Sequence, residues 1–242
     1  MNMLEVKNLS KVLGERQVLE NMSLSVQQGE ILFVLGRSGV GKSVLLKTIV
    51  GLIHQDKGEV WIDGEKTHPE RELAMVAVRR QCGLVFQSPA LFDSMTVKEN
   101  LIFGDEDKAR HISATMAWLK LPEKILNFYP SELSFGFQKK VSLLRTLLSN
   151  PKYLLFDEPT TGLDPVTTNL VNDVIRDCAK ARNMGCLVVS HDLQSAYHLA
   201  DRIVLIDQGK IALSGTPSNF KESDYPLAVA FRKGTINFAE GY

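Results

Sequence analysis

The sequence has little of several features that mark particular classes of protein. Its 242 residues include 28 basic and 28 acidic side chains, so the formal net charge is zero and there is no overall basic field to attract nucleic acid. Its 3 cysteines, Cys82, Cys178 and Cys186, stand far apart, without the spacing of a disulfide framework or a zinc site. We therefore expect core thiols that stay reduced and no nucleic-acid partner.

Long hydrophobic runs are missing as well. Apolar stretches such as 31–35 fall far short of the roughly 20 residues that cross a bilayer, and the first residues lack the apolar core of a signal peptide. Hydrophobic residues make up 44% of the chain and charged residues 23%, the balance of an ordinary globular protein. We expect a single domain over residues 1–242 that does not cross a membrane by itself.

Short strands alternate with helices along most of the chain. Segments 4–6 and 18–26 alternate apolar and polar residues, which is typical of half-buried antiparallel strands. Continuous apolar runs indicate strands buried on both faces, at 31–35, 82–86, 153–157, 187–190 and 202–206. Helical spacing follows at 44–53 and 165–182. We predict an α/β fold with a mainly parallel core sheet and an N-terminal antiparallel β subdomain.

No buried-strand run occurs between residues 88 and 148, where prolines interrupt helical patterns. We predict a helical subdomain there. The core α/β unit and β subdomain are assigned to 1–87 and 149–220, and residues 221–242 form a C-terminal tail.

A glycine-rich loop follows the first buried strand. Residues 36–43, Gly-Arg-Ser-Gly-Val-Gly-Lys-Ser, match the phosphate-binding pattern G-x-x-x-x-G-K-[ST]. Such a loop turns backbone N–H groups toward phosphates, and the helix that follows adds its positive N-terminal end. The predicted nucleotide-binding residues here are Gly36, Arg37, Ser38, Gly39, Val40, Gly41, Lys42, Ser43 and Val44. Lys42 would bridge the β- and γ-phosphates, and the Ser43 hydroxyl would bind Mg²⁺.

A pair of acids ends a later apolar strand. Asp157 and Glu158 follow residues 153–156, and the carboxyl end of such a strand is where ligands bind in open α/β sheets. We expect Asp157 to hold Mg²⁺ through water and Glu158 to polarise the attacking water as general base.

Together with these motifs, the rest of the chain resembles the ATP-binding subunits of ABC transporters over nearly its whole length. Four further segments occur in that family's order: Gln87 after a strand, the signature-like 133–138, the D-loop-like 161–164, and His191 at a strand end. The resemblance implies a P-loop NTPase fold whose helical subdomain carries the signature.

The resemblance also implies an ATPase that uses ATP and Mg²⁺. Gln87 would be a further Mg²⁺ ligand, and His191 would hold the γ-phosphate beside Glu158 and Lys42. It implies a head-to-tail homodimer that sandwiches two ATP molecules. Ser134 and Gly136 would contact the nucleotide of the other subunit, which Asp164 would face.

Two positions depart from the family pattern. Phe135 and Phe137 replace the first glycine and the glutamine of the usual signature Leu-Ser-Gly-Gly-Gln, so we expect slow hydrolysis because a bulky side chain restricts close backbone approach. The aromatic residue that usually stacks on adenine is replaced by Leu13. Leu13 or Val18 would pack on the base, and weaker base discrimination follows.

Within the family, segments 86–97, 129–134 and 224–234 resemble the Mla-type lipid transporters that work with MCE-domain proteins. This predicts an ATPase subunit that powers movement of phospholipid or another lipid, with permease subunits and an MCE-domain protein as partners. The expected location is cytoplasmic, on the inner face of the cytoplasmic membrane through the permease. An apolar cluster after Gln87, of Leu91, Phe92 and Met95, is expected to receive the membrane subunit.

Three alternatives remain open. The chain could serve a small-solute importer, for example one for amino acids. It could be a soluble ABC-type ATPase of translation or DNA repair. A third reading is a subunit that binds ATP without useful hydrolysis, although Glu158 and His191 argue against it.

Overall fold

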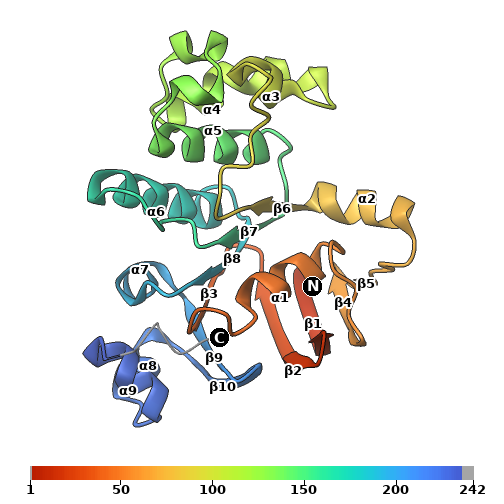
Figure 1. The fold of residues 1–242 in the computed structure, drawn as a ribbon, viewed down its shortest axis with the longest axis vertical. Helices are drawn as coiled ribbons and strands as arrows, with labels where there is room; N and C mark the ends of the chain where they lie inside the picture. Colours follow the sequence, from red (N-terminus) through yellow and green to blue (C-terminus); the bar gives the residue numbers. More distant parts are fainter. Residues whose placement is uncertain (1, 236–242) are drawn as a thin grey trace.

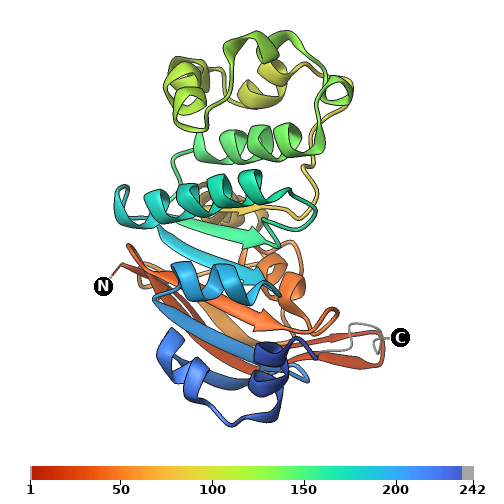
Figure 2. The same ribbon diagram turned by 90° about the vertical axis from the view of Figure 1, so that its left-hand side faces the viewer.

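Two β-sheets form the centre of the molecule in the computed structural model, which describes residues 2–235 (Figures 1 and 2). A six-stranded sheet has the order β10-β9-β3-β8-β7-β6, and a four-stranded sheet has the order β2-β1-β4-β5. The strands are β1 (Met3–Leu13), β2 (Arg16–Gln27), β3 (Ile31–Gly36), β4 (Lys57–Ile62), β5 (Glu65–Lys66), β6 (Cys82–Val85), β7 (Tyr153–Asp157), β8 (Gly185–Ser190), β9 (Arg202–Asp207) and β10 (Lys210–Gly215).

Helices cover both faces of the larger sheet and form a separate layer at one end. They are α1 (Lys42–Ile49), α2 (Glu72–Gln81), α3 (Val97–Ile102), α4 (Ile112–Trp118), α5 (Phe135–Leu147), α6 (Pro165–Lys180), α7 (Leu193–Leu199), α8 (Pro217–Glu222) and α9 (Pro226–Lys233), with short 3₁₀ turns η1 (Glu106–His111), η2 (Glu123–Asn127) and η3 (Pro130–Glu132). Within residues 2–235, none of these helices has the length and apolar character needed to span a bilayer.

The parallel core predicted from the apolar runs is confirmed. β3 pairs in parallel with β8 and β9, and β7 pairs in parallel with β6 and β8. Every residue of β3 is buried. Ile31 and Phe33 belong to the core cluster shared with α6, whereas Leu32 and Val34 face the cluster shared with α1 and the smaller sheet. A strand packed on both faces needs apolar residues at every position, which is why no alternation is visible there.

The N-terminal strands pair antiparallel as predicted but are longer than the alternating pattern indicated. β1 and β2 continue to a turn at Gly14, whose φ is 61°. The first helix is shorter than its apolar spacing suggested. It ends at Ile49, because Gly51 turns with φ 70° where the Met75 side chain lies 2.5 Å from the position of an added Cβ. β5, β10, α2, α7, α8 and α9 were not anticipated.

The segment between β6 and β7 is helical and lies at one end of the molecule, beyond α6 (Figures 1 and 2). Its first loop is organised by the side chain of Asn100, which is completely buried. This side chain accepts a hydrogen bond from the Phe92 backbone N–H at 2.8 Å and donates to the carbonyls of Phe92, Met95 and Thr96 at 3.0–3.1 Å. One amide therefore fixes the loop that presents Phe92.

The C-terminal helices pack on the core. α8 crosses the boundary expected between core and tail at residue 220, and Phe220, Leu227 and Phe231 are buried in the same cluster as the central strands. The final part of the expected tail, residues 236–242, lies outside the described residues.

Replacing Asn100 by Ala should lower the free energy of unfolding by about 2–3 kcal/mol, because the Phe92 N–H loses its acceptor and three carbonyls lose a donor. Urea unfolding measures the change. The matched control is Asn127→Ala at an exposed position. Equal stability of the two variants would show that the amide network does not hold the loop.

Candidate functional site

The residues with chemical function meet at one edge of the larger sheet. β3 leads into the glycine-rich loop, β7 ends at Asp157, β8 ends at Ser190, and Gln87 follows β6. Because these neighbouring strands are parallel, their carboxyl ends share an edge. A cavity of about 590 Å³ opens there.

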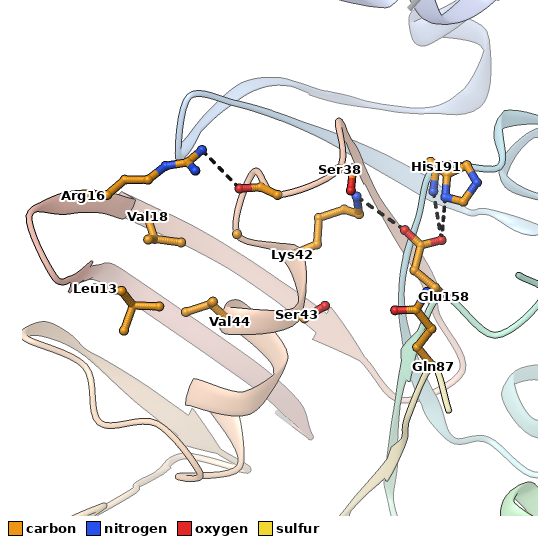
Figure 3. A pocket seen from close by; sticks show the side chains of 12 residues that line it. Leu13, Arg16, Val18, Ser38, Lys42, Ser43, Val44, Gln87, Glu158 and His191 are labelled. Atoms are coloured by element: carbon orange, nitrogen blue, oxygen red, sulfur yellow. Dashed lines mark hydrogen bonds and ion pairs between the residues drawn. The ribbon is translucent and has the colours of Figure 1, made fainter. Parts of the chain in front are cut away.

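Most of the residues predicted from the sequence line this cavity (Figure 3). Its lining consists of Leu13, Arg16, Val18, Ser38, Gly39, Gly41, Lys42, Ser43, Val44, Gln87, Glu158 and His191. Figure 3 shows two ends, with Leu13, Arg16 and Val18 on one side of the loop and Glu158 and His191 on the other. Lys42 points from the loop toward Glu158.

The glycine-rich loop lies so close to β2 that position 41 has no room for a side chain. Gly41 has φ 108°, and an added Cβ there would lie 2.8 Å from the Val18 carbonyl oxygen. Lys42 follows as the first residue of α1 and is 7% exposed. Its Nζ donates to the carbonyls of Gly36 and Arg37 at 2.8 and 3.0 Å. Burial lowers the pKa of Lys42, against the opposing pull of the Glu158 and Asp157 charges.

Oxygen atoms suited to a hard cation lie beside the loop. The Ser43 hydroxyl donates to Asp157 Oδ1 at 2.8 Å, and Gln87 lines the same cavity. Burial raises the pKa of Asp157, although the Ser43 hydrogen bond acts in the other direction. Within residues 2–235, no group of three or more His, Cys, Asp or Glu side chains forms a complete metal cage. This donor set fits Mg²⁺, which takes one or two carboxylates together with substrate phosphates.

Glu158 is the most highly connected carboxylate of the site. Its Oε1 lies 3.4 Å from Lys42 Nζ, and its Oε2 lies 2.8 Å from His191 Nδ1. Burial alone would raise the pKa of Glu158, but the His191 hydrogen bond and the charges of Lys42 and His191 together hold it below its ordinary value. The same hydrogen bond raises the pKa of His191, in spite of partial burial. Glu158 also has φ 48°, a left-handed conformation that is strained for a non-glycine residue.

Sequence reasoning missed several groups that support Glu158. The hydroxyls of Thr161 and Ser190 each donate to Oε2 at 3.3 Å. Lys139, 5% exposed on α5, donates to the backbone carbonyls of Glu158 and Pro159 at 3.4 Å. The sequence does not distinguish Lys139 from the polar residues beside it on α5. Its contact depends on how α5 packs against the end of β7.

The residues expected to act on a partner subunit do not line this cavity. Ser134 precedes α5, and Gly136 lies in its first turn, where an added Cβ would be 3.6 Å from the Thr167 side chain. Asp164 caps α6 by accepting hydrogen bonds from the N–H groups of Val166 and Thr167. The structure thus places the starts of α5 and α6 next to each other, outside the cavity of the same chain.

Phe135 lies on that outer surface. Its side chain is 44% exposed, its ring centroid is 5.4 Å from Lys139 Nζ, and its edge is 3.4 Å from the position of a Cβ on Gly162. The ring therefore stands between the signature segment and the loop before α6. Phe137, by contrast, is partly buried and packs against the core.

The other end of the cavity is aliphatic. Leu13 is 43% exposed at the end of β1, Val18 is nearly buried, and Val44 lies on α1. Arg16 was not anticipated. It begins β2, and its Nη2 donates to the Gly39 carbonyl at 3.3 Å.

Comparison with known proteins decides the family. Residues 19–161, which contain the loop, Gln87, the signature segment and both acids, match the model of the ABC transporter family. The chain belongs to the ABC transporter ATP-binding family. It is an ATPase that binds ATP, and Mg²⁺ is the usual partner of the nucleotide. Cassettes of this family form dimers and work with membrane permeases.

Relatives named for different substrates have similar sequence identity to this chain. The intermembrane phospholipid transport system ATP-binding protein MlaF of Haemophilus influenzae is 32% identical, over 96% of this chain and 91% of that protein. The glutamine transport ATP-binding protein GlnQ of Escherichia coli is 38% identical, over 89% and 92%. A solved dimeric ATP-binding cassette in a post-hydrolysis state, bound to ADP and Pi, has a TM-score of 0.81 and 28% identity, over 88% and 98%.

The contact between Glu158 and His191 should be visible by titration of the ABC ATPase without nucleotide. The pKa of His191 should lie above 6.5 in the unmodified chain and fall toward 6.5 in Glu158→Gln. Because the folded-state pKa is raised, this ion pair stabilises the fold below pH 6.5 and its contribution is lost as the pH rises through the folded pKa. NMR titration of the imidazole measures the value, with His191→Ala for assignment and Asp157→Asn as the control for loss of a nearby carboxylate. An unchanged pKa in Glu158→Gln would contradict the pairing.

Removing the ring of Phe135 should raise the rate of ATP hydrolysis. We expect Phe135→Gly to increase turnover about three- to tenfold, equivalent to about 0.6–1.4 kcal/mol of activation free energy, because the signature backbone can then approach a nucleotide closely. Phe135→Ala is the paired variant, since it removes the ring without adding the freedom of glycine. Phosphate release under saturating ATP is the measurement, and no gain in either variant would remove the steric argument.

Proposed function

We propose that the 590 Å³ cavity is the Mg²⁺-ATP site and that the chain powers an ABC transporter that moves phospholipid or another lipid. The observation that carries the first part is the convergence of Lys42, Ser43, Glu158 and His191 in one cavity beside a phosphate-binding loop. Asp157 does not line the cavity itself but accepts a hydrogen bond from the Ser43 hydroxyl. The second part rests on the MlaF relative and on the segments that resemble its branch.

Each residue has a distinct role in this proposal. Residues 36–44 surround the triphosphate, with Lys42 against the β- and γ-phosphates. Ser43, Gln87 and Asp157 hold Mg²⁺, which when bound neutralises charge on the phosphate oxygens. Glu158 accepts a proton from the attacking water, and His191 contacts the γ-phosphate.

Without nucleotide, Glu158 contacts two basic side chains, Lys42 and His191. A triphosphate competes with the carboxylate for both of them, because its charge is larger and its oxygens face the same loop. Binding would therefore release Glu158 toward the water it must activate. The chain's own charges thus link substrate binding to readiness for hydrolysis.

A second copy completes the site in this proposal. Ser134, Gly136 and Asp164 lie together on a surface of the same chain away from its own cavity. In a head-to-tail homodimer each chain would present this surface to the nucleotide of the other. Phe135 would then lie in the interface.

We propose that the permease contacts an apolar hollow of about 470 Å³ beside the helical subdomain. Of the expected cluster only Phe92 lines it, because Leu91 packs against the core and Met95 lines a separate hollow. The tilted rings of Phe92 and Phe103 contact each other there, with centroids 4.7 Å apart and planes at 45°. Leu52 contributes a third exposed apolar side chain. An exposed apolar groove of this kind suits a helix of another subunit. The chain would then be held at the inner face of the cytoplasmic membrane through its permease, with an MCE-domain protein as a further partner.

The runner-up is an amino-acid importer, which the 38% identity to GlnQ favours. Purification of the tagged chain from detergent-solubilised membranes, followed by mass spectrometry, separates the two. A permease together with an MCE-domain protein supports lipid transport. A different permease with a solute-binding protein supports the importer, and recovery of the chain without any permease would overturn both.

Glu158→Gln should reduce ATP turnover by about 10²- to 10⁴-fold, because the general base is lost. Binding of Mg²⁺-ATP should persist, since Lys42 and the loop remain. Steady-state hydrolysis and equilibrium nucleotide binding are the two measurements. Full turnover in this variant would show that Glu158 is not the base.

Phe92→Asp should reduce recovery of the permease with the tagged chain by about tenfold, because a charge replaces an apolar contact in the hollow. Hydrolysis by the isolated chain should not change. Leu73→Asp on α2 is the matched control, since Leu73 is 89% exposed and does not line the hollow. Undiminished recovery with Phe92→Asp would place the permease elsewhere.

A further inference from the structure

We propose that Arg16 binds the nucleobase of the substrate by stacking its planar guanidinium on the ring, in place of an aromatic side chain. This inference rests on the proposed nucleotide site and adds a residue that sets how the base is recognised.

The position of Arg16 fits the base end of the cavity. It lines the wall with Leu13, Val18 and Val44, across the loop from Glu158 and His191 (Figure 3). A nucleotide whose γ-phosphate reaches Glu158 extends its base in the opposite direction. The base would then lie among these four side chains.

Arg16 is the planar group at this end. The cavity lining in the described part of the chain includes no Phe, Tyr or Trp. Leu13, Val18 and Val44 can cover part of a base, but they offer no flat, polarisable surface. A guanidinium is flat and positively charged, so it is attracted to the electron-rich face of an aromatic ring.

One hydrogen bond orients the exposed guanidinium, and no carboxylate pairs with it in the described part of the chain. Nη2 donates to the Gly39 carbonyl at 3.3 Å, which ties the side chain to the phosphate loop. Arg16 also borders a smaller hollow of about 220 Å³ with Val40 and Gln208, so it forms a wall between two spaces. Across residues 2–235, none of the ion pairs within 4.0 Å involves Arg16.

A positive charge near a triphosphate could instead attract the phosphates. The guanidinium contacts the Gly39 carbonyl of the loop, but Arg16 shares its end of the cavity with the aliphatic Leu13, Val18 and Val44. Because the buried Lys42 occupies the phosphate end, we assign Arg16 to the base. The two roles differ in what they predict for a ligand that has phosphates but no base.

Stacking has a consequence for selectivity. A guanidinium on the face of a ring does not read the hydrogen-bonding edge, which is where adenine and guanine differ. We therefore expect ATP and GTP to bind with dissociation constants within about threefold of each other, and Arg16→Ala to weaken both by the same factor.

The experiment is calorimetric titration of the full chain with ATP, GTP and inorganic tripolyphosphate, each with Mg²⁺. Arg16→Ala should weaken ATP and GTP about two- to fivefold and leave tripolyphosphate unchanged. Arg16→Trp should restore nucleotide affinity, whereas Arg16→Lys, which keeps the charge without the plane, should not. Arg71→Ala, at a position whose side chain is 71% exposed outside the cavity, is the control for loss of one arginine.

Three results would overturn the inference: no loss of nucleotide affinity in Arg16→Ala, an equal loss for tripolyphosphate, or full rescue by Arg16→Lys. Lys42→Ala separates these from failure of the site itself. If Lys42→Ala abolishes ATP binding and Arg16→Ala has no effect, only the role of Arg16 fails. If Lys42→Ala binds ATP normally, the cavity is not the nucleotide site.

Discussion

The parallel pairing of β3 with β8, and of β8 with β7, is the constraint on which the rest of the site depends. Leu35 pairs with Ser190, and Asp157 pairs with Val189, so the loop after β3 faces the acids after β7 and the histidine after β8. These strands are buried on both faces. Packing against both core clusters therefore fixes their register, and a shift of one residue would exchange the two faces of a strand.

Several charged side chains at that edge are buried. Lys42, Asp157 and Glu158 are each less than 9% exposed. Carboxylates buried beside a single lysine would be costly, but two hydroxyls together with the backbone N–H and imidazole of His191 share the remaining hydrogen bonds of Glu158. The left-handed backbone of Glu158 turns its carboxylate into this network. Hydrogen bonds and ion pairs thus hold Glu158 in position.

The two ends of the cavity differ in how they are built. The end beside the glycine-rich loop uses contiguous residues of one loop and one helix, together with Glu158 after β7, two strands away in the sheet. The opposite end is assembled from β1, β2 and α1, which offer aliphatic surface and one arginine. The starts of α5 and α6 form a separate surface, and the helical subdomain that carries α5 is joined to the core by Lys139 and by Trp118, whose indole donates to Asp177 at 3.1 Å. Movement of that subdomain would therefore shift Lys139 relative to the Glu158 carbonyl that it contacts.

The sequence by itself determined the glycine-rich loop, the acid pair, the histidine, the parallel core and the helical segment between β6 and β7. Each of these features is a short run of consecutive residues, because a phosphate-binding loop or a strand buried on both faces restricts the residue type at successive positions. Only the tertiary structure decided that Arg16 enters the cavity, that Lys139 supports Glu158, and that α9 packs on the core. Those contacts join residues far apart in the chain, and a single arginine, lysine or short helix carries no local pattern that fixes its distant partner.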